Sequence, residues 1–193
     1  MGSTRFSPHV FAREAAAFPR AARSLGPAPV ADHPPEGVRS PAWFVLGHSM
    51  ELSLKALVAC RTGREPDRTH CLEHLARSAL SSQDLRALER SAGRRVVARG
   101  LRDLRRRLPA RDAISVAVRD GERREMRQRP FDATGILGLP NAVHGNAASA
   151  GSPCRTRYAE AGHMRYPLWR EAFAIGELLV DGAAAATDAV ARS

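Results

Sequence analysis

The chain has 193 residues, of which 44% are hydrophobic but only 5% are aromatic, and its formal net charge is +10. This length is sufficient for one domain with a sizeable core, here built mostly from Leu, Ala and Val. No run comes near the length of a membrane span, about eighteen apolar residues, and the N-terminal segment lacks an apolar signal core, so we expect a cytoplasmic protein that does not enter a membrane.

A first helix is predicted near the N-terminus. Ser7 offers an N-cap oxygen, Pro8 suits the first helical position, and the apolar spacing that follows continues to a stop at Gly26. Pro19 lies inside this pattern, so we expect it to kink or divide the helix. Residues 26–40 are rich in Pro and Gly and predict an irregular connector.

The stretch 43–80 predicts two amphipathic helices joined by a short polar loop. Apolar residues recur in both at spacings of three and four, which is the pattern of a helix facing a core. Gly63 and Pro66 should end the first helix, and the second begins near Thr69. The predicted core positions are Trp43, Leu46, Met50, Leu54, Leu57, Val58, Leu72, Leu75, Ala76 and Ala79.

Three polar residues, His48, Glu51 and Lys55, share another face of the first of these helices. Glu51 and Lys55 have the favourable acid-before-base i,i+4 order. Two interpretations are open. The group is either an internal polar network that fixes the register of the helix, or a small pocket for an anion or a nucleotide lined by Lys55.

A long cationic helix should follow. Ser81 with Asp84 resembles a capping box at its start, and Pro109 ends it. Four arginines recur along it at three and four, which gives it one strongly basic side: Arg95, Arg99, Arg102 and Arg106.

The basic charge of the chain is concentrated around this helix. Residues 94–129 contain 13 arginines against five acidic residues, a local net charge of +8. Such a segment is typical of a surface that binds a polyanion. The chain has 29 arginines and one lysine, and a GC-rich coding bias would also produce that skew. A solvated helix face is the simpler alternative.

Residues 110–156 predict a basic, partly irregular insertion. Residues 113–118 alternate as in a strand and end at a hairpin-like turn at Asp120-Gly121, while 122–129 would form one short helix. A last helix is predicted over about 168–186. Its inward positions are Trp169, Ala172, Phe173, Gly176, Leu179 and Ala183.

Parts of the chain resemble HEPN proteins (higher eukaryotes and prokaryotes nucleotide-binding). The string GHSMELSLKAL at 47–57 is similar to their first core helix. Thr69-His70-Cys71-Leu72 resembles the Thr-His-Asp-Leu run that usually follows, with Cys71 in place of Asp. The segment 157–167, which contains Tyr158 and Tyr166, resembles a tyrosine-rich segment before the last helix of bacterial members.

The resemblance implies an all-α, HEPN-like bundle of four to five helices over residues 1–193, with the basic segment as an insertion. It also implies a ligand, RNA or a nucleotide, and a place in a toxin–antitoxin or defence system. The implied protein partners are a second copy of the chain, as a homodimer, and a cognate antitoxin or nucleotidyltransferase. We favour a non-catalytic binding protein that uses the cationic segment.

The alternative is a metal-independent endoribonuclease. HEPN ribonucleases carry an Arg-x(4–6)-His motif, in which His transfers a proton and Arg holds the phosphate. Three pairs here have that spacing, and about three are expected by chance in so arginine-rich a chain. The position of the family motif, late in the bundle, favours Arg157 and His163 as the catalytic pair.

Metal and cofactor sites are not predicted. His70, Cys71 and His74 cluster, but zinc needs three or four ligands in tetrahedral arrangement and this stretch lacks a matching set. No Walker A motif and no dinucleotide-binding fingerprint occurs.

Overall fold

A computed structural model describes residues 7–25, 36–108, 113–128, 133 and 169–193, and all regular structure in these ranges is helical. The predicted all-α class is thus confirmed for these residues. In chain order the elements are α1 (Pro8–Leu25), the 3-10 helix η1 (Glu36–Val38), α2 (Arg39–Thr62), α3 (Leu72–Ala79), α4 (Ser82–Arg107), α5 (Ala113–Gln128) and α7 (Trp169–Arg192). Of the helices in these ranges, none combines the length and the apolar character that crossing a membrane requires.

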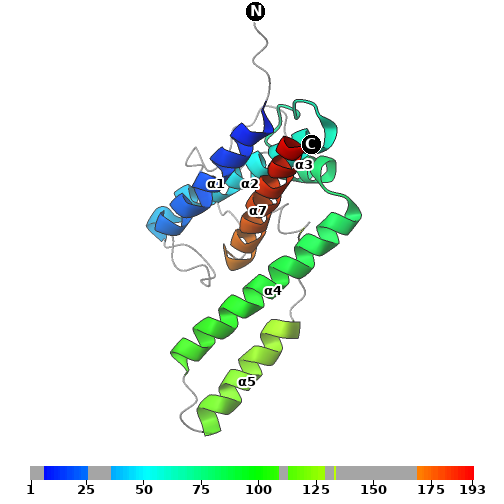
Figure 1. Ribbon diagram of the computed structural model, residues 1–193. Helices are drawn as coiled ribbons and strands as arrows, with labels where there is room; N and C mark the ends of the chain where they lie inside the picture. The colour runs from blue at the N-terminus through cyan, green and yellow to red at the C-terminus, as the bar shows by residue number, and fades with distance from the viewer. Residues whose placement is uncertain (1–6, 26–35, 109–112, 129–132, 134–168) are drawn as a thin grey trace, which may run out of the picture.

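Helix α2 lies at the centre of a bundle, where it packs against α1, α3 and α7 (Figure 1). Its apolar stripe meets that of α7, with Trp43 and Trp169 edge to face at 5.1 Å between ring centroids. A Cβ at Gly176 would lie 2.7 Å from Cδ1 of Leu46, so glycine is what permits this close approach of the two helices. The core positions predicted on α3 and α7 are buried, as are those on α2 except Leu57, which is half-buried.

The predicted stop of α2 and the predicted cap of α4 both form in the structure. Gly63 ends α2 in a left-handed conformation, with φ of 66°, and its N–H donates to the carbonyl of Ala59. At the start of α4 the Ser81 side chain accepts from the Asp84 N–H, and the Asp84 carboxylate accepts from the Ser81 N–H, which completes a capping box.

Two local predictions need correction, and one of two alternatives at Pro19 is excluded. Residues 113–118 are not a strand but the first part of α5, and Gly121 lies inside that helix without a turn. Of the two outcomes expected at Pro19, a kink or a division of the helix, the division does not occur. Residues 36–40, placed in the connector, form η1 and the start of α2, because a proline at 41 is tolerated in the first turn, whose N–H groups lack helical partners anyway.

Helices α4 and α5 form a second unit of the architecture. The first half of α4 packs on α7, whereas its second half extends past the bundle, where α5 lies beside it (Figure 1). The predicted insertion 110–156 is therefore helical over 113–128, and apart from Ala133 the rest of it lies outside the described residues.

Leu54 offers a direct test of the core. Its side chain is fully buried on α2, so Leu54→Ala should lower the free energy of unfolding by about 2–5 kcal/mol in chemical denaturation. Val190→Ala, which truncates a side chain that is 46% exposed, should change stability by no more than about 0.5 kcal/mol. Equal stability losses in the two variants would contradict the arrangement of α2.

The capping box predicts a linked change in stability and titration. Hydrogen bonds from Ser81, its side chain foremost, hold the pKa of Asp84 below its usual value. Ser81→Ala should cost about 1 kcal/mol of stability and raise the pKa of Asp84 in an NMR titration.

The sign of the pH effect follows from that lowered pKa. The contribution of Asp84 to stability is present above its unfolded-state pKa and is lost as the pH falls through its folded-state pKa. Ser81→Ala should therefore lose less stability than the wild type over that acidic range. An unchanged pKa of Asp84 in the variant would contradict this account of the cap.

Candidate nucleic-acid interface

The four arginines predicted as a binding face lie on α4, but the structure divides them into two pairs. Arg95 and Arg99 face α7. Nη2 of Arg95 lies 2.7 Å from Oδ2 of Asp181, and its Nη1 lies 3.6 Å from Oε2 of Glu177. Arg99 donates to the same Glu177 carboxylate, and its guanidinium lies 6.0 Å from the ring centroid of Phe173.

This first pair holds two helices together. The Glu177 side chain is only 8% exposed, so burying its charge requires close cationic partners. Arg95 and Arg99 supply them, and Leu88, Ala92 and Val96 add apolar contact on the same side of α4. Their regular spacing predicted all four arginines on one face. Spacing does not show which of them pairs with α7, whose Glu177 is 78 residues from Arg99.

The second pair, Arg102 and Arg106, is exposed. We call residues 101–107 of α4 together with α5 the arginine arm. Within the described part of the chain, six of its arginines form no salt bridge and no side-chain hydrogen bond, namely Arg102, Arg105, Arg106, Arg119, Arg123 and Arg124. Its residues, 101–107 and 113–128, include eight arginines and four acidic residues, a net charge of +4. An arm of this charge attracts polyanions.

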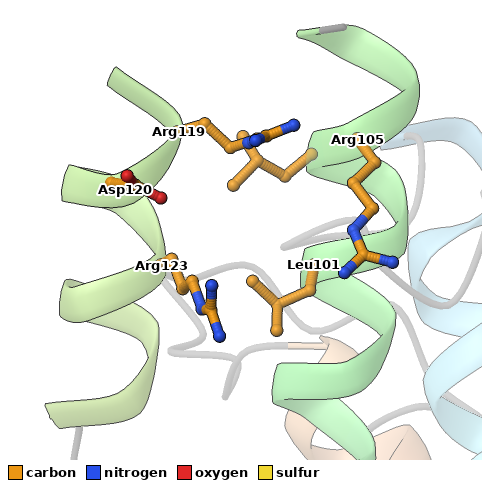
Figure 2. Close-up of a pocket in the computed structure, with 6 residues that line it drawn as sticks. Leu101, Arg105, Arg119, Asp120 and Arg123 are labelled. Atoms are coloured by element: carbon orange, nitrogen blue, oxygen red, sulfur yellow. The ribbon is translucent and has the colours of Figure 1, made fainter. Parts of the chain in front are cut away.

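A small cavity of about 80 Å³ lies in the arginine arm between α4 and α5. Leu101, Leu104 and Arg105 line it from α4, while Arg119, Asp120 and Arg123 line it from α5. Figure 2 shows Arg119 and Arg123 extending from α5 toward α4. The one ion pair in the described residues that links the two helices, Arg107 to Glu122, is long at 4.0 Å.

The residues His48, Glu51 and Lys55 do lie together, around a buried carboxylate on α2. Glu51 is 1% exposed, and its Oε1 accepts a hydrogen bond of 2.7 Å from Nζ of Lys55. Nδ1 of His48 lies 3.6 Å from Oε2 of Glu51, and its ring stacks on Phe44 and lies perpendicular to the ring of Phe18. The ammonium group of Lys55 is thus used inside the protein.

His70 is a fourth member that the sequence pattern did not reveal. Its Nδ1 lies 3.0 Å from Oε2 and 3.1 Å from Oε1 of Glu51, which ties the segment before α3 to α2. His70 lies just outside a helix and 19 residues from its partner, so no periodicity connects the two. The chemistry of this cluster is that of a buried charge neutralised in place.

The other candidates have these outcomes. Arg157 and His163 lie outside the described residues. His74 pairs with Asp67, with 2.9 Å between Nε2 and Oδ2. Over the described ranges, His, Cys, Asp and Glu side chains form no group of three or more that could hold a metal ion.

Comparisons with protein-family models, with curated proteins and with solved structures found no match to this chain. A functional proposal for it therefore depends on its own residues, on their geometry and on the motifs at 47–57 and 69–72.

Glu51→Gln should destabilise the fold strongly, because it leaves the partly buried Lys55 without its counter-charge. We expect a loss of about 3 kcal/mol in chemical denaturation, at the lower end for a broken buried pair because Lys55 still contacts solvent. Glu65→Gln, the same change at an exposed site, should stay within about 0.5 kcal/mol. Wild-type stability of Glu51→Gln would show that the cluster contributes nothing to folding.

Proposed function

We propose that this protein is a non-catalytic, HEPN-like RNA-binding protein that holds RNA phosphates on the arginine arm. The observation that carries the proposal is the concentration of arginines without acidic partners on the arm, among the described residues, with all but Arg119 exposed. Arginine suits this ligand because its planar guanidinium donates two parallel hydrogen bonds to one phosphate.

The position of the arm supports binding to an extended polymer. It projects beyond the bundle, so a nucleic-acid strand can lie along α4 and α5 without contacting α1 or α3 (Figure 1). Backbone contacts of this kind are largely independent of sequence and supply most of the non-specific affinity. The choice of RNA over DNA rests on the resemblance to HEPN proteins, which also supports a setting in a toxin–antitoxin or defence system.

The arrangement argues against a purely compositional origin of the charge. A coding bias raises the number of arginines, but it does not determine which of them are neutralised. Here Arg95 and Arg99 meet Glu177 and Asp181, whereas the arginines further along α4 meet no acidic side chain on a described helix except at Arg107.

Salt dependence tests the proposal. Binding to a single-stranded RNA should weaken steeply with salt, since each neutralised phosphate contributes a slope of about −0.7 in log K against log salt. The double change Arg102→Gln with Arg106→Gln should lower affinity and reduce that slope by about 1–1.5, with unchanged stability because both side chains are exposed. Fluorescence anisotropy at several salt concentrations measures both.

The matched control is Arg61→Gln with Arg64→Gln. It removes the same charge from exposed positions at the end of α2 and should leave the RNA affinity and the slope close to wild type. Binding that does not respond to salt, or an equal effect of the two double variants, would contradict a phosphate-binding arm.

A further inference from the structure

The cavity between α4 and α5 differs from the rest of the arginine arm because it is enclosed on two sides. Its arginines come from both helices, Arg105 from α4 and Arg119 and Arg123 from α5. In Figure 2 the two α5 side chains extend toward α4, and that of Arg105 runs along α4. Leu101 and Leu104 supply its apolar wall, and Leu104 is fully buried. Polar interactions beside such a wall are stronger than those on an open surface, because less water competes for the donors.

The volume of the cavity limits what can occupy it. By this measure of cavity size about 10–15 Å³ admits one water molecule, so a space of about 80 Å³ holds a few waters or one compact group. A phosphate group fits this limit, whereas a nucleobase with its sugar does not. An occupant attached at one point can therefore place its phosphate inside and keep the remainder outside.

The charge of the lining selects among phosphates. Three arginines and Asp120 give a local charge of +2, and none of the three arginines has an ion-pair partner among the described residues. An internal phosphodiester carries one negative charge, while a phosphomonoester carries about −1.5 to −2 at pH 7. The monoester thus comes closer to neutralising the cavity, and it has only one substituent to accommodate.

We propose that this cavity is a binding site for a terminal phosphate, the phosphomonoester at the end of an RNA strand or on a free nucleotide. The proposal rests on the proposed function for its RNA source, and it adds a distinct subsite that recognises the end of a strand. Because Arg105 belongs to α4 and the other two arginines to α5, a bound phosphate also joins the two helices.

The test compares two RNAs of one sequence, one with a 5′-phosphate and one with a 5′-hydroxyl, for binding to the full chain by fluorescence anisotropy at pH 7.5. The 5′-phosphorylated RNA should bind about tenfold more tightly. Lowering the pH to about 5.5 should reduce that preference, because the second pKa of a phosphomonoester is about 6 and the group loses a charge below it.

Two double variants test whether the preference for the 5′-phosphorylated RNA arises in the cavity. Arg119→Gln with Arg123→Gln should abolish the discrimination between the two RNAs. Arg102→Gln with Arg106→Gln, a matched pair that does not line the cavity, should weaken both RNAs equally and keep their ratio. A nucleoside monophosphate that removes the preference by competition would identify the free nucleotide as a second source of the same ligand.

Two outcomes would overturn the subsite. The first is equal affinity of the wild type for the two RNAs, which needs no variant and leaves RNA binding by the arm intact. The second is a preference that survives in Arg119→Gln with Arg123→Gln. Failure of the proposed function looks different, since the 5′-hydroxyl RNA would then not bind, while the 5′-phosphorylated RNA and a nucleoside monophosphate would still bind to the cavity.

Discussion

The arrangement of this protein depends on how the buried carboxylate of Glu177 is neutralised. Few side chains of α4 are fully buried, with Ala92 and Leu104 the two that qualify, so apolar contact alone attaches this helix weakly to the bundle. Arg95 and Arg99 add directional charge-assisted bonds to α7 at the point where α4 leaves the core. The position of the arginine arm follows from that attachment.

Glu51 on α2 is a second buried carboxylate, and a different set of partners neutralises it. Its partners are Lys55 and His48 on its own helix and His70 from the segment before α3. In each case a carboxylate in the core fixes the position of a neighbouring element, α4 for Glu177 and the α2–α3 connection for Glu51. Basic residues near these carboxylates therefore serve the fold.

The sequence predicted well those features that depend on neighbours along the chain. The stripe of Trp43, Leu46 and Met50, the cap at Ser81 and the stop at Gly63 were all predicted correctly, because helical periodicity and capping act within a few residues. The prediction of a strand over 113–118 was wrong because it, too, considered only neighbouring residues. Its short alternation carries strand character, but no partner strand lies in the described residues, and the helix-forming residues after Gly121 extend the helix across it.

The candidate site was predictable in composition but not in detail. Spacing alone placed Arg95, Arg99, Arg102 and Arg106 on one face, and only the path of α7 distinguishes the pair that is neutralised. The cavity lined by Arg105, Arg119 and Arg123 arises because α5 lies beside α4, and α5 was not predicted as one helix. The neutralised pair and the cavity both depend on contacts between different helices, and a single sequence does not reveal such contacts.

The continuity of α4 has a mechanical consequence. Its 26 residues form one uninterrupted helix about 39 Å long, attached to α7 over its first half and free of α7 at the arm. Because the helix is attached only over its first half, a small rotation there displaces its free end much further than its attached end. A substitution at Glu177 would then turn the arm arginines to a new direction while preserving the distances between those on α4, so the direction of the arm is set by a residue that does not belong to it.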